Sequence, residues 1–148
     1  VALSKGLGCP VGSVLAGSAA EILRAVRARR MFGGAMRQSG ILAAAGLYAL
    51  DHHLAGLAED HANARLIAEH LAGLSGVTLD LSTVETNIIV FQLAPGLPDA
   101  AAIAARASEA GVLISALGPR TVRAVTHRDV SRSDCRQAAD CLARVIEW

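Results

Sequence analysis

The sequence predicts an α/β protein, and three observations support this class. In the second half, short β-rich apolar runs alternate with helical stretches. In the first half, alanine-rich segments repeat their apolar side chains at helical spacing. The 148 residues are 53% hydrophobic and 3% aromatic, so a core of Ala, Leu, Val and Ile is expected.

Composition also excludes several classes of protein. The net charge of +1 and the scattered arginines offer no basic block for nucleic acid. No apolar run reaches the roughly 18 residues of a membrane-spanning helix. Three cysteines at these spacings match neither a disulfide framework nor a zinc site, so we expect no metal and a cytoplasmic protein. Because the chain begins at Val1, we expect a piece of a longer protein.

The first fifty residues predict two short strands and two helices. Residues 1–4 are expected to end one strand and residues 11–16 to form another, with Lys5 on the glycine-containing connection between them. Ser18 and the glutamate three residues later have capping-box spacing, which predicts a helix ending near Arg30. The glycines of "MFGGAMRQSG" predict a loop, and "ILAAAGLYAL" predicts a small-residue helix packed on all sides.

The rest of the chain predicts a long helix followed by alternating strands and helices. The long helix begins between Asp51 and Ala55 and runs to about Leu74, with one face formed by Leu66, Ile67, His70, Leu71 and Leu74. Strands are expected at "VTLDL", "TNIIVFQL", "VLIS" and "TVRAVT", and a helix at "DAAAIAARASEA". A closing amphipathic helix spans residues 131–148, with Leu142, Val145 and Ile146 facing inward.

Three basic residues are candidates for chemistry. Lys5 is the only lysine among fourteen Lys and Arg residues, and its glycine-flanked position suggests a cleft in which an amine could attack a carbonyl group. Arg123 lies within an apolar β-run, where a guanidinium needs an anionic partner such as a carboxylate or phosphate. Arg37 stands in a glycine-rich loop without a nearby acidic residue. The alternative for each of the three is an ordinary solvent-facing side chain.

The histidines and cysteines carry weaker signals. His61 and His70 do not share a helix face as metal ligands would, and His127 is most simply a turn residue. Cys9, Cys135 and Cys141 are expected to act as small hydrophobic side chains, and no Ser/His/Asp order or phosphate-binding glycine pattern is convincing by its spacing.

Four segments together resemble one enzyme family. "LSKGLGCPVGS", "GGAMRQSGILAAAGLYAL", "EDHANARLIAEHL" and "VRAVTHRDVS" are similar, in order and spacing, to the low-specificity L-threonine aldolases. These are pyridoxal-phosphate enzymes of the β-eliminating lyase group with the aspartate-aminotransferase fold. The resemblance covers the C-terminal portion of such an enzyme. It implies that residues 1–50 end the large cofactor domain, residues 51–75 form a linking helix, and residues 76–148 form a small α/β domain.

The resemblance also implies roles for the candidate residues. Lys5 would hold pyridoxal 5'-phosphate as a Schiff base, and Arg123 would bind the substrate α-carboxylate. Arg37 would contact the cofactor phosphate of a neighbouring subunit, and Arg30 matches a position that is basic in the family. The family's ring-stacking histidine, its aspartate at the pyridine nitrogen and most of its phosphate-binding residues correspond to positions before Val1.

The activity implied by the resemblance is retro-aldol cleavage of a small β-hydroxy amino acid. The substrates would be L-threonine or L-allo-threonine, the products glycine and acetaldehyde, and the assembly a homodimer or homotetramer. The chain alone is expected to be inactive. Two alternatives remain open at this point, namely a related β-eliminating lyase and a non-catalytic fragment that packs against or binds other proteins.

Overall fold

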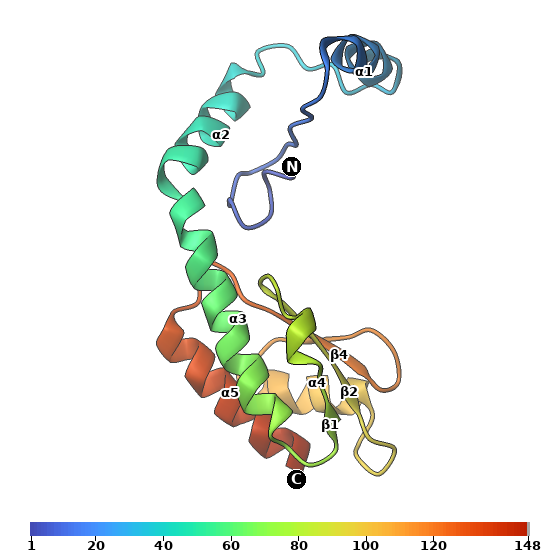
Figure 1. Cartoon of the computed structure of the whole chain (residues 1–148), viewed down its shortest axis with the longest axis vertical. Helices are drawn as coiled ribbons and strands as arrows, with labels where there is room; N and C mark the ends of the chain where they lie inside the picture. The colour runs from blue at the N-terminus through green and yellow to red at the C-terminus, as the bar shows by residue number, and fades with distance from the viewer. Residues whose placement is uncertain (148) are drawn as a thin grey trace. The chain divides into compact units, whose positions relative to one another are not determined.

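The computed structural model describes residues 1–147 and divides the chain into two compact units (Figure 1). The first unit comprises residues 1–55, and the second begins at Gly56. Among the described residues, no single helix is long and apolar enough to cross a membrane. One bent pair of consecutive helices, Gly40–His52 and Leu54–Ala72, reaches the required length and apolar composition only when the two are taken together. The three-part division predicted from the sequence stays a prediction.

The first unit contains two helices preceded by a turn. Helix α1 spans Ala19–Met31, as the capping signal predicts: the Ser18 amide donates to the Glu21 carboxylate at 2.9 Å, and the Glu21 amide donates back to the Ser18 hydroxyl at 3.4 Å. Helix α2 spans Gly40–His52. The glycine-rich segment between the helices is a loop, as expected.

The prediction of two strands near the N-terminus is wrong. Only one isolated antiparallel bridge forms, between Ala2 and Ser13. Gly8 and Gly12 adopt positive φ angles of 68° and 114°, which fold the chain into a turn where an extended pair would need β geometry. One bridge is all that such a short, turn-rich segment supports.

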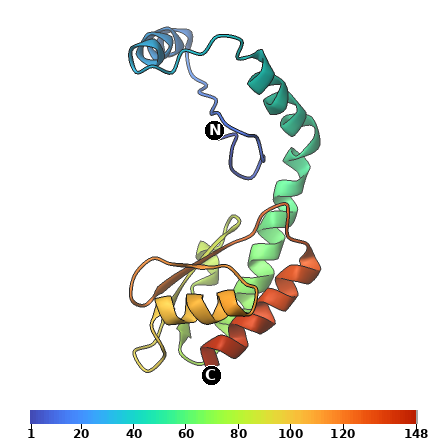
Figure 2. The ribbon, with the colours of Figure 1, turned by 180° about the vertical axis from the view of Figure 1, so that it is seen from behind.

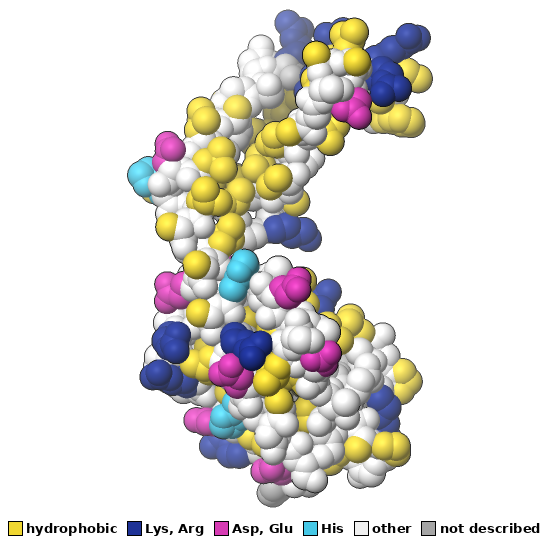
Figure 3. All heavy atoms as spheres, in the orientation of Figure 1, with side chains coloured by type: hydrophobic (Ala, Val, Ile, Leu, Met, Phe, Trp, Pro, Cys, Tyr) yellow, Lys and Arg dark blue, Asp and Glu magenta, His cyan; other side chains and the backbone are white. Residues whose placement is uncertain are grey.

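Helix α2 is also less buried than its small residues predict. Gly46 and Ala49 are its only buried residues, whereas Ile41, Leu47 and Tyr48 are exposed in the described chain. The reason is that the N-terminal turn covers one face of α2. Apolar side chains therefore remain open on the first unit (Figure 3).

The second unit is a four-stranded antiparallel sheet with helices on one face (Figure 2). The strand order is β1-β2-β4-β3. The strands are β1 (Val77–Thr78), β2 (Ile88–Leu93), β3 (Ser115–Ala116) and β4 (Thr121–Val125). The helices are α3 (Leu57–Ala72), α4 (Ala100–Glu109) and α5 (Arg132–Glu147), with a short 3-10 turn η2 at Leu81–Thr83. A further 3-10 turn, η1 at Leu54–Gly56, lies at the boundary between the two units.

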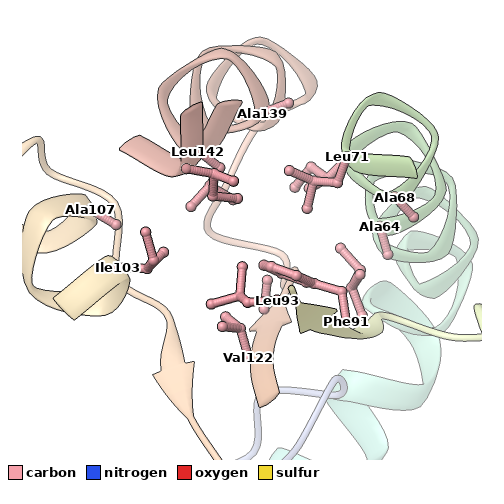
Figure 4. Close-up of a cluster of buried hydrophobic side chains, with 14 of the residues drawn as sticks. Ala64, Ala68, Leu71, Phe91, Leu93, Ile103, Ala107, Val122, Ala139 and Leu142 are labelled. Atoms are coloured by element: carbon pink, nitrogen blue, oxygen red, sulfur yellow. The ribbon is translucent and has the colours of Figure 1, made fainter. Parts of the chain in front are cut away.

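Buried and exposed side chains alternate along the strands, which places the core on one side of the sheet. In β2, Ile89, Phe91 and Leu93 are buried while the intervening side chains are exposed. Phe91 and Leu93 point toward the helices, where Leu71 of α3 and Leu142 of α5 complete the cluster (Figure 4). Within the described residues of the second unit, no helix packs on the other face of the sheet (Figure 2).

Several predicted elements are shorter than expected. "VTLDL" forms a strand only at its first two residues, because Asp80 then accepts a hydrogen bond from the Ser82 amide at 2.9 Å and starts η2. "VLIS" contributes only Ser115 to β3. His70, expected on the inner face of α3, is exposed and lies 3.7 Å from Asp140. The closing helix is confirmed through Glu147, and its predicted last residue, Trp148, lies outside the described residues.

Candidate active site

Lys5 stands on a turn that is closed by backbone hydrogen bonds. The Gly8 amide donates to the Lys5 carbonyl at 2.8 Å, and the Leu3 amide donates to the Gly12 carbonyl at 2.9 Å. The Lys5 side chain is exposed and has no hydrogen bond or ion pair with a described residue. The turn therefore presents a free primary amine, although on an exposed surface and not in the cleft that the sequence suggests.

Contacts with α2 and with His53 at its end hold this turn in place. Leu7 and Cys9 are buried, with exposed fractions of 5% and 7%. The Cys9 thiol lies 3.7 Å from the Ala45 carbonyl oxygen, and the His53 ring Nδ1 lies 2.7 Å from the Leu7 carbonyl oxygen. These contacts fix the backbone on which Lys5 sits.

Arg30 and Arg37 belong to an arginine-rich stretch of the first unit. Residues 24–37 carry five arginines and no acidic residue, and basic side chains gather around α1 (Figure 3). Arg30 lies in the last turn of α1, and Arg37 in the following loop, before Gln38 with its positive φ of 52°. Both are exposed, and neither forms an ion pair or a hydrogen bond with a described residue, Lys5 included.

Arg123 occupies the middle of β4, on the face of the sheet away from the helices. Its neighbours Val122 and Ala124 point into the core, and its cross-strand partners are Val90 of β2 and Ser115 of β3. The side chain is half-buried, and its Nε is shielded from solvent without a hydrogen-bond partner. A buried guanidinium donor without a partner is costly, so this position favours a bound anion.

The structure places the predicted residues in both units. Lys5, Arg30 and Arg37 belong to the first unit, and Arg123 belongs to the second. Among the described residues, no group of three or more His, Cys, Asp or Glu side chains could hold a metal ion. The chemistry available is that of one amine and three guanidinium groups.

The structure also connects residues that the sequence did not single out. The Thr126 hydroxyl, directly after β4, donates to the backbone carbonyl of Asp60 at 2.6 Å. Asn87, directly before β2, donates from Nδ2 to the Thr126 carbonyl at 2.7 Å. Sixty-six residues separate Asp60 from Thr126, so no local pattern could have indicated this contact.

Similarity to known proteins identifies the family of this chain. The model of the family described as beta-eliminating lyase matches residues 1–94. The chain belongs to the beta-eliminating lyase family. It is 47% identical over 139 residues to the low specificity L-threonine aldolase of Escherichia coli strain K12. The aligned region covers 94% of this chain and 40% of that enzyme. The low-specificity L-threonine aldolase 1 of Arabidopsis thaliana is 37% identical over 99% of this chain and 41% of its own length.

Solved structures of other proteins share the fold of this beta-eliminating lyase chain. A Listeria monocytogenes crystal structure described as an L-allo-threonine aldolase has a TM-score of 0.72 at 19% identity, covering 98% of this chain and 43% of that chain. A structure from Exiguobacterium described as an aromatic amino acid beta-eliminating lyase/threonine aldolase has a TM-score of 0.73 at 17% identity, with coverages of 98% and 44%. The predicted family and fold are thus confirmed. The chain spans about 40% of the length of the curated relatives that it matches.

Proposed function

We propose that the enzyme carrying this chain cleaves L-threonine or L-allo-threonine into glycine and acetaldehyde with pyridoxal 5'-phosphate. The proposal is supported by the 47% identity to the E. coli threonine aldolase. The structural observation that carries it is the shielded, unpartnered Nε of Arg123 on the helix-free face of the sheet. Such a donor suits the carboxylate of an amino acid.

The residues present fit the cofactor by the chemistry of their donor groups. Lys5 offers the only lysine amine of the chain, on a turn held by glycines with positive φ, and it would hold the cofactor aldehyde. Arg37, and Arg30 in the same stretch of chain, would contact the phosphate, because residues 24–37 are rich in arginine and free of carboxylates. When bound, pyridoxal phosphate supplies an electron sink for the charge left at Cα after the Cα–Cβ bond breaks.

Arg123 would provide substrate orientation. A guanidinium fork that binds both oxygens of a carboxylate fixes the direction of the carboxylate as well as its position. With the carboxylate held, rotation about the bonds to Cα is restricted, so the Cα–Cβ bond can be kept in the orientation that cleavage requires. In this proposal Arg123 acts by binding and orientation, and it transfers no proton.

Assembly is part of the proposal. We infer that Arg37 serves the cofactor of a neighbouring subunit, so that the enzyme is a homodimer or homotetramer. Its exposure and its lack of an ion partner among the described residues support this inference. The expected cytoplasmic location stays a prediction.

Product analysis tests the proposed reaction. Purified enzyme carrying this chain is incubated with L-threonine, L-allo-threonine, L-tyrosine and L-tryptophan, and the released products are identified. Glycine and acetaldehyde from the two threonine isomers support the aldolase. Release of pyruvate and ammonia with phenol or indole from the aromatic amino acids favours the second candidate, a β-eliminating lyase, which the description of the matched family also suggests. No turnover of any of the four supports the non-catalytic alternative.

A further inference from the structure

Hydrogen bonds to Asn87 and Asp60 hold Thr126, the residue directly after β4. Thr126 is 2% exposed. Its amide donates to the Asn87 carbonyl at 3.0 Å, and its carbonyl accepts from Asn87 Nδ2 at 2.7 Å. Its hydroxyl donates to the Asp60 carbonyl at 2.6 Å. The backbone of Thr126 is therefore tied to the start of β2, and its side chain to the first turn of α3.

These bonds lie at the end of β4 that has the least other support. Strand β3 pairs with β4 only at Val122 and Arg123. Beyond Arg123, the ladder of β4 continues on one side alone, where Ala124 and Val125 pair with β2. A strand end with one neighbour frays more readily than one with two, so the bond from the Thr126 hydroxyl to Asp60 adds a support besides the pairing with β2.

The contact with α3 reaches a rigid part of the second unit. Asp60 is buried in the first turn of α3, and one helical turn or more further along, Ala64, Ile67 and Leu71 pack into the core. The Thr126 hydroxyl thus anchors the strand to a helix whose position is determined by the core. Arg123 lies three residues before this anchor.

We propose that Thr126 is a positioning residue for Arg123, acting through the hydrogen bond from its hydroxyl to the Asp60 backbone carbonyl. This inference rests on the proposed binding of the substrate carboxylate by Arg123. A guanidinium held in one place binds a carboxylate at a smaller entropic cost than a guanidinium on a fraying strand. Thr126 touches no reacting atom, so its contribution is to substrate affinity and not to cofactor binding.

The test compares threonine variants in the enzyme carrying this chain. Thr126→Val keeps the shape of the side chain and removes the donor, whereas Thr126→Ser restores a donor. Thr83→Val is the matched control, because the Thr83 hydroxyl also donates to an aspartate carbonyl, that of Asp80 at 2.7 Å, but at η2 and not at β4. KM and kcat for L-threonine are measured together with cofactor absorbance and thermal melting.

The expected result is a change in the kinetics for L-threonine without a change in cofactor binding. Thr126→Val should raise KM about tenfold and, because Arg123 also orients the Cα–Cβ bond, lower kcat, while cofactor absorbance stays unchanged. Thr126→Ser should restore most of the affinity, and Thr83→Val should leave both constants unchanged. If Thr126→Val does not fold, Asn87→Ala, which removes only the Nδ2 bond, should still raise KM about threefold.

Two results would overturn the inference. An unchanged KM in folded Thr126→Val, or in Asn87→Ala where that variant is the one used, shows that the bond does not position Arg123. Equal loss of kcat and cofactor absorbance without a change in KM shows a general structural role. Arg123→Ala, assayed in parallel, separates this failure from that of the proposed function: if Arg123→Ala also leaves KM unchanged, the carboxylate-binding role itself is wrong.

Discussion

The His53 ring Nδ1 lies 2.7 Å from the Leu7 carbonyl oxygen and joins the turn that carries Lys5 to the end of α2. Forty-six residues separate the two partners. The rings of both His52 and His53 contact Tyr48, with centroids 4.2 Å and 5.4 Å apart, but the hydrogen bond to the Leu7 carbonyl belongs to His53. The two neighbouring histidines thus allow a paired test of how the turn is supported.

Replacing His53 should loosen the Lys5 turn. In His53→Ala, the Leu7 carbonyl loses its side-chain partner, so the turn should open more often than in the unaltered chain. A protease specific for lysine has a single site in this chain, after Lys5, and its cleavage rate reports that opening. We expect faster cleavage in His53→Ala and an unchanged rate in His52→Ala. Equal rates in the two variants would mean that the hydrogen bond does not support the turn.

Lys5 should be the residue that holds the cofactor. Borohydride reduction of the enzyme carrying this chain, followed by peptide mapping, should place the pyridoxyl group on Lys5, because every other basic side chain here is an arginine. Lys5→Ala should abolish the labelling and the cofactor absorbance together. A label found on a lysine outside this chain would refute the assignment.

Arg123 should bind substrate and leave cofactor binding intact. Removing one partner of a charge-assisted pair costs about 2 to 5 kcal/mol. Arg123→Ala should therefore lose threonine cleavage while its cofactor absorbance persists, as measured by steady-state kinetics and absorption spectra. The exposed Arg136 on α5 is a suitable control, and Arg136→Ala should behave like the unaltered enzyme.

Arg37 should couple cofactor binding to assembly. If its guanidinium contacts phosphate in a neighbouring subunit, Arg37→Ala should weaken cofactor retention, and pyridoxal phosphate should stabilise the oligomer less than in the unaltered enzyme. Sedimentation with and without cofactor measures both effects. Arg24→Ala, on the exposed part of α1, serves as the control. Full activity in a monomeric enzyme would contradict the shared site.

Asp60 should make the second unit less stable as pH rises. Burial raises the pKa of its carboxyl group, against the opposing attraction of His127 and His61. An acid with a raised pKa contributes stability below its unfolded pKa of about 3.9 and loses that contribution as pH rises through its folded pKa. Asp60→Asn, which keeps the backbone carbonyl, should melt at a higher temperature at neutral pH.

The pH dependence of the rise in melting temperature is the main check of the prediction for Asp60. The difference in melting temperature between Asp60→Asn and the unaltered enzyme should narrow as the pH falls through the raised pKa of the folded carboxyl group, which then becomes neutral. The exposed Glu85 provides the control, and Glu85→Gln should show no such dependence. A difference that widens on acidification would show that Asp60 is stabilising as a carboxylate.

The sequence by itself determined the features that depend on near neighbours. The capping box of Ser18 and Glu21 joins residues three positions apart, so the start of α1 could be predicted from the pattern. The β-rich run "TNIIVFQL" likewise predicted a strand, although its four consecutive apolar residues did not indicate which side chains enter the core. The resemblance to the threonine aldolases followed from motif order and spacing in the same way.

Tertiary structure alone decided what depends on distant partners. "VTLDL" has the composition of a strand, but only Val77 and Thr78 pair with β2 before the turn that begins at Asp80. No pattern indicated that Thr126 would donate to Asp60, or that the Nε of Arg123 would be shielded without a partner. The physical reason is that pairing, burial and polar contacts depend on which segments meet in space, whereas caps and alternation depend on a few consecutive residues.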